Sequence, residues 1–283
     1  MDSDCWACVF LRVNWLARAK FRLVCRDWAD ILDNGHLWLD VYMGPVLLRR
    51  ACEHGCLTAA QWLVATFSLT TVNARGNDNW ALRWSCANGH LAVAQWLVAT
   101  FDLTAADARA RDNWALRYSC EKGYLAVAQW LTATFSLATA DARANRNDAL
   151  LLSCWKGHLE VAQWLAATFD LTADDARARD NYALRLSCRG GRLATAQWLT
   201  TTFGLVAADA RTCDNSALRY SCLNGHLVVA QWLVAAFGLT AEDARDYGNW
   251  ALGNSCEAGH LEVARWLVST FGLKPHCEKC CPQ

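Results

Sequence analysis

The stretch Asn79–Thr104 reads NWALRWSCANGHLAVAQWLVATFDLT, and its layout recurs down most of the chain. Its glycine returns every 34 residues without slippage, at Gly55, Gly89, Gly123, Gly157, Gly191, Gly225 and Gly259. A fixed period of this size is typical of a solenoid, in which each unit buries its apolar face only against its neighbours. The sequence therefore predicts one elongated stack of seven repeats.

Each copy predicts two helices. Leu82 and Cys86 are spaced four apart and share one face of a first helix. Asn79 is the expected N-cap of this helix, because its side chain can accept a hydrogen bond from the first turn. Gly89 ends the helix as a left-handed residue. The broad apolar face of Leu91–Phe101 predicts a second helix, packed inside the stack.

The connection between repeats carries a third signal. Thr104 and Asp107 have the spacing of a capping box, with Asp in place of Glu or Gln, and the spacing recurs at Thr172/Asp175 and Thr240/Asp243. We expect an extra helical turn here instead of a β-hairpin. A periodic arginine follows, and we expect it to tie each loop to the next repeat: Arg75, Arg109, Arg143, Arg177, Arg211 and Arg245.

Three side-chain ladders keep the register of the glycine. The tryptophans are Trp62, Trp96, Trp130, Trp164, Trp198, Trp232 and Trp266; the phenylalanines are Phe67, Phe101, Phe135, Phe169, Phe203, Phe237 and Phe271. The cysteines are Cys52, Cys86, Cys120, Cys154, Cys188, Cys222 and Cys256. A residue that every repeat needs is expected in the core, where cysteine behaves as a small hydrophobe. A ladder spaced by whole repeats supplies no disulfide pairing, so we expect thiols in a reducing compartment.

At these residues the sequence resembles the ankyrin-repeat family. ALRWSCANGHLAVAQWL follows the family's frame, with Ala81 and Arg83 in place of its Pro and His, and the period is one residue longer than the usual 33. The resemblance spans residues 46–274 and implies an all-α, ankyrin-like helical solenoid of seven repeats. The LTxxDAR and AQWL segments are also similar to ankyrin-rich proteins of large DNA viruses, which would place the protein in a host cell.

Residues 1–43 do not fit the repeat. Within Phe21–Trp38, FRLVCRDWADILDNGHLW, the spacing resembles the second half of an F-box, although the Leu-Pro that opens that motif is missing. The resemblance implies binding to the linker subunit of a ubiquitin ligase through Leu23, Val24, Trp28, Leu37 and Trp38. The alternative is that this segment is only a helical cap on the stack. Residues 275–283 form a Cys-rich tail.

The composition argues against several classes of partner and location. The net charge is zero, so neither nucleic acid nor a membrane is the expected partner. No run approaches 18 apolar residues, and Arg12 interrupts the apolar stretch at the N-terminus, which argues against a signal peptide. We therefore expect a monomer in the cytoplasm or nucleus.

No residue set predicts an enzyme. The histidines after the repeat glycine, such as His90, are replaced by Cys56, Tyr124 and Arg192 in other copies, so they are expected to satisfy a turn. The Cys-x-x-C pairs at Cys5/Cys8 and Cys277/Cys280 lie at opposite ends of the chain. Zinc usually takes four ligands from segments that meet, so we predict no metal and no cofactor.

The positions that vary between repeats point to a binding surface. Offsets of nine, five and two before each glycine fall on one stripe of the first helix, beside the invariant Leu and Cys face. In ankyrin-repeat proteins this stripe lines the concave surface that holds a partner. Its Trp, Tyr and Arg content is typical of protein interfaces, although some of these side chains could pack between helices. The predicted target-binding residues are Trp80, Trp84, Trp114, Arg117, Tyr118, Trp155, Tyr182, Arg185, Tyr220 and Trp250.

These features predict a protein–protein interaction adaptor that recruits substrates to a cullin-type ubiquitin ligase, with the target on the concave surface. The alternative is an ankyrin scaffold or decoy without a ligase link, in which residues 1–43 only cap the stack. A metal or redox protein built on the terminal cysteines is the third hypothesis.

Overall fold

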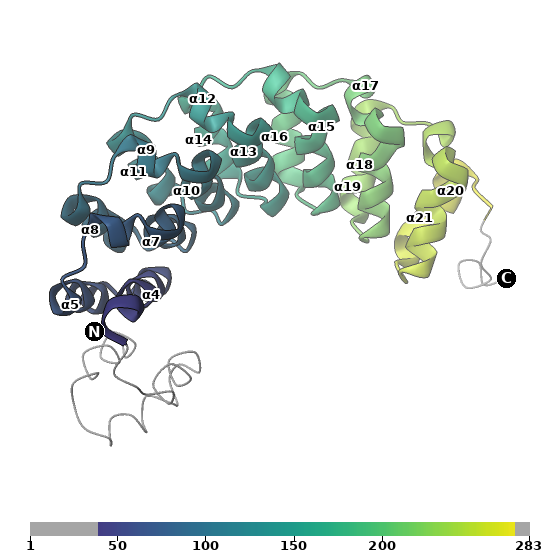
Figure 1. Cartoon of the computed structure of the whole chain (residues 1–283). Helices are drawn as coiled ribbons and strands as arrows, with labels where there is room; N and C mark the ends of the chain where they lie inside the picture. Colours follow the sequence, from purple (N-terminus) through teal and green to yellow (C-terminus); the bar gives the residue numbers. More distant parts are fainter. Residues whose placement is uncertain (1–38, 275–283) are drawn as a thin grey trace. The chain divides into compact units, whose positions relative to one another are not determined.

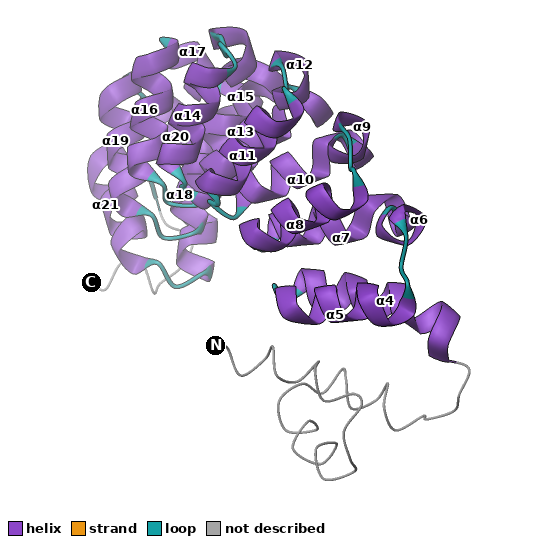
Figure 2. Cartoon of the chain, turned by 90° about the vertical axis from the view of Figure 1, so that its left-hand side faces the viewer, coloured by secondary structure: helices purple, strands orange, loops and turns teal. Residues whose placement is uncertain are grey.

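The computed structural model describes residues 39–274, which form eighteen helices, α4 to α21, and no strand (Figure 1). The chain divides into two compact units, one of residues 1–119 with 126–137 and the other of residues 120–125 with 138–283. Figure 2 shows that the described chain consists of helices joined by short loops. The all-helical fold that the sequence predicts is confirmed.

The first unit holds the first three helix pairs. Its helices are α4 (Leu39–Glu53), α5 (Leu57–Phe67), α6 (Thr71–Ala74), α7 (Gly76–Ala87), α8 (Leu91–Phe101), α9 (Ala105–Ala108), α10 (Ala110–Glu121) and α11 (Leu125–Phe135). Helix α8 has the predicted bounds of the second helix in its repeat. Gly89 precedes it with φ +78°, so the predicted left-handed end of the first helix is confirmed.

The second unit holds the remaining pairs. Its helices are α12 (Thr139–Ala142), α13 (Ala144–Lys156), α14 (Leu159–Thr168), α15 (Ala173–Arg189), α16 (Leu193–Phe203), α17 (Ala207–Ala210), α18 (Thr212–Leu223), α19 (Leu227–Phe237), α20 (Ala241–Glu257) and α21 (Leu261–Phe271). Helices α15 and α20 are long because each includes the short connecting helix that stands alone elsewhere, as α17 does before α18.

Leucine, alanine and cysteine fill the core of each helix pair. Leu82 of α7 and Leu97 of α8 are fully buried, and so is Cys86. The phenylalanines from Phe101 onward are buried as predicted. The tryptophan ladder is only half-buried, so its assignment to the core was wrong in part. Each of these tryptophans lies edge-on to the phenylalanine five residues later, with ring centroids 5.6–6.1 Å apart.

The buried cysteines behave as the ladder predicts, with one exception. Cys86, Cys154 and Cys222 are free thiols, and burial raises the pKa of each to about 12. Thiols with such a high pKa carry almost no thiolate and are poor nucleophiles and metal ligands. Cys256 is disulfide-bonded, which corrects the expectation of a ladder made only of thiols.

Three left-handed residues interrupt each first helix near its N-terminal end, from the second repeat to the seventh. In the second repeat, Asn77, Asp78 and Asn79 have φ of +54°, +54° and +60°. The predicted N-cap role of Asn79 is therefore wrong, because a helix N-cap adopts extended backbone angles and the Asn79 side-chain oxygen has no hydrogen-bond partner. Asparagine recurs here because it tolerates positive φ better than most side chains.

The predicted capping boxes and inter-repeat arginines are present. The Thr104 backbone N–H donates to the Asp107 carboxylate at 2.8 Å, which starts the extra turn α9. Arg75, one repeat earlier, donates to the same carboxylate through Nε and Nη2 at 2.8 and 2.9 Å. Equivalent pairs in the second unit join Arg143 to Asp175, Arg177 to Asp209 and Arg211 to Asp243. Each carboxylate is nearly buried and links two consecutive repeats.

The histidine of each Gly-His pair contacts the glycine turn of the preceding repeat. His90 Nε2 lies 3.0 Å from the carbonyl oxygen of Glu53, which only accepts, so the ring donates. The ring covers Gly55, where an added Cβ would meet His90 Nδ1 at 2.5 Å. In the fifth repeat, Arg192 stands in place of the histidine, and its side chain covers Gly157 of the fourth repeat. The predicted structural role of these histidines is confirmed.

Candidate protein-binding surface

The variable stripe of the first helices forms an aromatic cluster in the first unit. Trp80 and Trp84 on α7 are stacked with ring centroids 5.2 Å apart, and Trp84 lies 5.1 Å from Trp114 on α10. Trp114 stacks on Tyr118 at 4.2 Å. All four rings are half-buried, and Trp84 and Trp114 each contact two neighbouring rings. This cluster presents a large, stiff apolar surface.

An arginine lies beneath the aromatic cluster and fixes it to the left-handed turn. Arg83 is only 4% exposed. Its Nε donates to the carbonyl of Asp78 at 2.7 Å, and its Nη2 donates to that of Asn77 at 2.9 Å. The guanidinium lies 5.0 Å from the Trp114 ring centroid. Arg117 repeats the arrangement in the third repeat, with Nε donating to Asp112 and Nη2 to Arg111.

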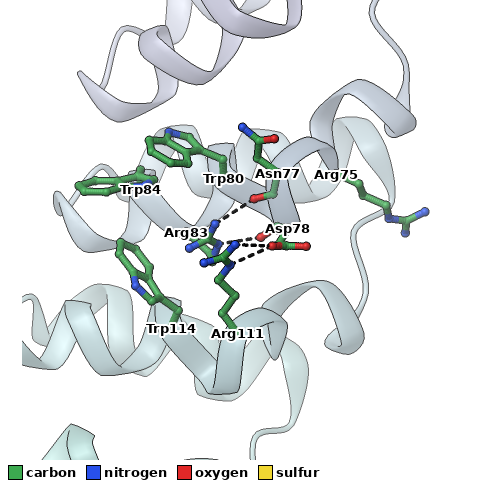
Figure 3. Close-up of a pocket in the computed structure, with 8 residues that line it drawn as sticks. All are labelled: Arg75, Asn77, Asp78, Trp80, Arg83, Trp84, Arg111 and Trp114. Carbon is green, nitrogen blue, oxygen red and sulfur yellow. Dashed lines mark hydrogen bonds and ion pairs between the residues drawn. The ribbon is translucent and has the colours of Figure 1, made fainter.

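Beside this cluster lies a pocket of about 630 Å³ (Figure 3). The indoles of Trp80, Trp84 and Trp114 stand on one side of it, and Arg83 and Arg111 reach toward Asp78 on the other. Arg111 and Asp78 form an ion pair of 2.8 Å, with side chains 60% and 58% exposed. The pocket thus combines three indoles with five polar or charged side chains.

The second unit pairs its stripe aromatics with cations. Tyr182 has the guanidinium groups of Arg179 and Arg185 at 5.3 and 5.2 Å from its ring centroid. Tyr220 lies edge-on to Trp250 at 5.6 Å and has Arg189 at 5.3 Å. Trp155 has the ammonium group of its neighbour Lys156 at 3.9 Å. Such cation–π contacts hold these half-buried rings in place.

The predicted target-binding residues divide into two groups. The aromatic ones are half-buried and line the stripe. Arg117 is buried, and both Arg117 and Arg185 point to turn carbonyls, so their contacts are within the chain. Ser216 and Leu186, which share the stripe's register, are buried. The predicted linker-binding residues Leu23, Val24, Trp28, Leu37 and Trp38 lie outside the described residues.

Sequence reasoning did not assign the five polar lining residues to a binding site: Arg83, Arg111, Asp78, Asn77 and Arg75. A signal for the first was present, because an arginine stands six residues before the repeat glycine at Arg83, Arg117, Arg185 and Arg219. This spacing did not show that the arginine donates to carbonyl oxygens of the left-handed turn, because the turn itself was not predicted. Arg111 and Asp78 come from different repeats, and only the structure brings them together.

Two other classes of site find no support within residues 39–274. No group of three or more His, Cys, Asp or Glu side chains there is placed to hold a metal ion. None of the described helices has the length and apolar character needed to cross a membrane.

Comparison with known proteins agrees with the fold. Residues 48–98 match the family model described as ankyrin repeats (many copies). No curated protein matches the chain. Among solved structures, the chain is similar to the ankyrin repeat domain of human ASB11, with 19% identity, 72% of this chain and 89% of that chain covered, and a TM-score of 0.48. It is also similar to an ankyrin repeat family protein from Legionella pneumophila, with 18% identity, coverage of 95% and 86%, and a TM-score of 0.43.

The 34-residue period, the helix pairs and the family match together define an all-α, ankyrin-like helical solenoid. Ankyrin repeats are protein-interaction modules, and the half-exposed aromatic stripe is consistent with that class.

Proposed function

We propose that this chain is a protein-recruiting adaptor whose aromatic stripe holds a target protein. The observation that carries the proposal is the row of half-exposed Trp and Tyr rings, which are fixed by stacking and by arginines before any partner arrives. Rigid aromatic side chains lose little conformational entropy on binding and dominate the energy of protein interfaces. The target would be a host protein if the resemblance to viral ankyrin proteins holds.

The second part of the proposal concerns the ligase. The spacing of Val24, Trp28 and Trp38 favours docking of the N-terminal segment on the linker subunit of a cullin-type ubiquitin ligase. The repeats would then hold the target while the ligase performs the chemistry, so no catalytic step is assigned to this chain. The competing proposal is a scaffold or decoy that binds the target and has no ligase link.

The test is direct binding of the full chain to the purified linker subunit, measured by surface plasmon resonance. We expect a micromolar or tighter complex that Trp28→Ala weakens at least tenfold. Trp6→Ala is the matched control, because it removes a tryptophan outside the motif. If wild-type protein does not bind the linker, or both variants bind equally well, the ligase link is lost and the scaffold proposal takes its place.

A further inference from the structure

The pocket between the second and third repeats is rich in hydrogen-bond donors. Indole and guanidinium groups only donate, and these are the groups of Trp80, Trp84, Trp114, Arg83 and Arg111. Within the described part of the chain, the three indole N–H groups have no hydrogen-bond partner, and Arg83 uses only Nε and Nη2. Arg75 extends away from the others in Figure 3 and is engaged by Asp107. The pocket therefore suits a ligand group that accepts hydrogen bonds.

The charges of the pocket also favour an anionic ligand. Asp78 is the single carboxylate of its lining, and Arg111 neutralises it at 2.8 Å. Arg83 is held by backbone carbonyls, which leave its positive charge without a carboxylate partner. Burial, followed by repulsion from Arg111, lowers the pKa of Arg83, and attraction to Asp78 offsets this only in part, so the cation is short of counter-charge. An anion entering the pocket would supply that counter-charge.

Three tryptophans near an aspartate could also suggest a cage for a cationic ligand such as methylated lysine. This arrangement is already occupied from within. The Arg83 guanidinium lies 6.0 Å from the Trp80 ring centroid and 5.0 Å from that of Trp114. A second cation would meet the like charges of Arg83 and Arg111, and Asp78 is already paired.

We propose that this pocket receives the carboxylate side chain of an aspartate or glutamate in the partner protein, with the apolar part of the same segment lying on the indoles. The proposal rests on the proposed function, because it takes the ligand to be a protein segment. A carboxylate accepts hydrogen bonds from guanidinium groups, and the Nη1 groups of Arg83 and Arg111, which do not bond to the turn or to Asp78, remain to donate to it.

The test uses peptides from a random 12-residue phage library selected on the immobilised full chain. Their affinities are then measured in solution at about 0.1 M salt, where charges within the pocket are only partly screened. We expect the selected peptides to carry Asp or Glu beside an apolar residue. Changing that acidic residue to its amide should weaken binding about tenfold or more.

Two variants that break the same ion pair separate charge from structure. Asp78→Asn removes the only carboxylate, so an acidic peptide should bind about threefold more tightly. Arg111→Gln removes a cation, so the same peptide should bind about threefold to tenfold more weakly. If the ion pair mattered only for the shape of the pocket, both variants would change affinity in the same direction. Arg265→Gln removes an exposed cation of α21 outside the stripe and should leave affinity within about twofold.

The other outcomes overturn the proposal in distinct ways. Selection of Lys- or Arg-rich peptides, with the effects of Asp78→Asn and Arg111→Gln exchanged, would show a cation site. Binding only after the acidic residue is replaced by phosphoserine would show a phosphate site. Affinity that depends on Tyr220 or Trp250, and not on Asp78 or Arg111, would remove the pocket while the protein-binding function stands. If no peptide binds the full chain, both proposals fall.

Discussion

Asparagine stands at the third left-handed position of every connecting turn: Asn79, Asn113, Asn147, Asn181, Asn215 and Asn249. The neighbouring positions vary among Asn, Asp, Arg, Cys, Tyr and Gly. A left-handed backbone costs most L-residues about 1–2 kcal/mol, and Asn is among those that adopt it most readily. The backbone thus favours the periodic Asn, and at Asn147 the side chain also joins two repeats, because its Nδ2 donates to the Asp175 carboxylate at 3.1 Å. The buried side-chain oxygen of Asn79 has no partner.

The positive φ at this position predicts different stabilities for two substitutions at Asn79. Asn79→Ala keeps the Cβ at φ +60° but loses the short polar side chain that favours this backbone, so the free energy of unfolding should fall by about 1 kcal/mol. Asn79→Gly keeps the positive φ without strain and should remain close to wild type. Urea unfolding followed by circular dichroism measures both. Equal stability of the two variants would show that φ is not what requires Asn.

A second residue-scale prediction concerns the glycine under each histidine. A Cβ at Gly191, where φ is +70°, would lie 2.7 Å from His226 Nδ1. Gly259 has φ +80° but would meet nothing described within 4 Å. Both Gly→Ala variants suffer the backbone strain, so their difference isolates the clash. We expect Gly191→Ala to lose about 1–3 kcal/mol more than Gly259→Ala in thermal or urea unfolding.

If Gly259→Ala is as destabilising as Gly191→Ala, the histidine contact adds nothing and the left-handed backbone alone explains the glycine. The double variant Gly191→Ala, His226→Ala provides a further control. It should recover part of the loss of Gly191→Ala, because the ring that meets the new Cβ is gone.

At the scale of the element, a single carboxylate both caps the connecting helical turn and binds an arginine of the preceding repeat. The Asp243 carboxylate accepts from the Thr240 N–H at its own helix start and from Arg211 of the preceding repeat. Hydrogen bonds from Arg211 lower the pKa of Asp243 to about 2. Because the carboxylate is nearly buried, removing the arginine leaves it with fewer donors than it needs.

We therefore expect Arg177→Met to lower the urea midpoint below that of the wild type, because Asp209 loses its charged partner and keeps its capping contact and the bond from Asn181. Arg245→Met is the matched control, since Arg245 has the same place in its repeat and no ion pair among the described residues. It should change stability by less than about 0.5 kcal/mol. Comparable losses in the two variants would show that the effect lies in the side chain's packing and not in the inter-repeat bond.

The periodicity alone predicts the helices and their caps. Leu91–Phe101 and the Thr104/Asp107 cap match the structure because period and capping are local properties of the chain. The left-handed turn was not predictable in this way, because its Asn is equally typical of an N-cap. The half-exposure of the Trp ladder and the Arg111–Asp78 contact depend on how neighbouring repeats meet. A pattern within one repeat does not contain that information.

At the scale of the whole molecule, stability is a sum over repeats and their interfaces, so small periodic effects accumulate. Burial lowers the pKa of His90, of His158 and of His226. The folded state therefore binds fewer protons than the unfolded chain below about pH 6.5. These histidines favour folding less as the pH falls from that value through their lower folded pKa.

The inter-repeat carboxylates add a second step at lower pH. Burial alone would raise the pKa of Asp175, but hydrogen bonds from Arg143 and Thr172 lower it to about 2, and Asp243 has a similar value. Their contribution to stability is present above about pH 4 and is lost between about pH 4 and pH 2. Acid should therefore weaken the stack in two separate ranges.

The final prediction separates those ranges by substitution. The urea midpoint of the wild type should fall between pH 7 and pH 5 and again below pH 4. The chain itself supplies a non-titrating replacement, because Arg192 covers Gly157 where other repeats use histidine. A variant with His90→Arg, His158→Arg and His226→Arg should have a smaller decrease between pH 7 and pH 5, with the decrease below pH 4 unchanged. If the urea midpoint of the triple variant falls as steeply between pH 7 and pH 5 as that of the wild type, groups other than these three histidines cause the decrease in that range.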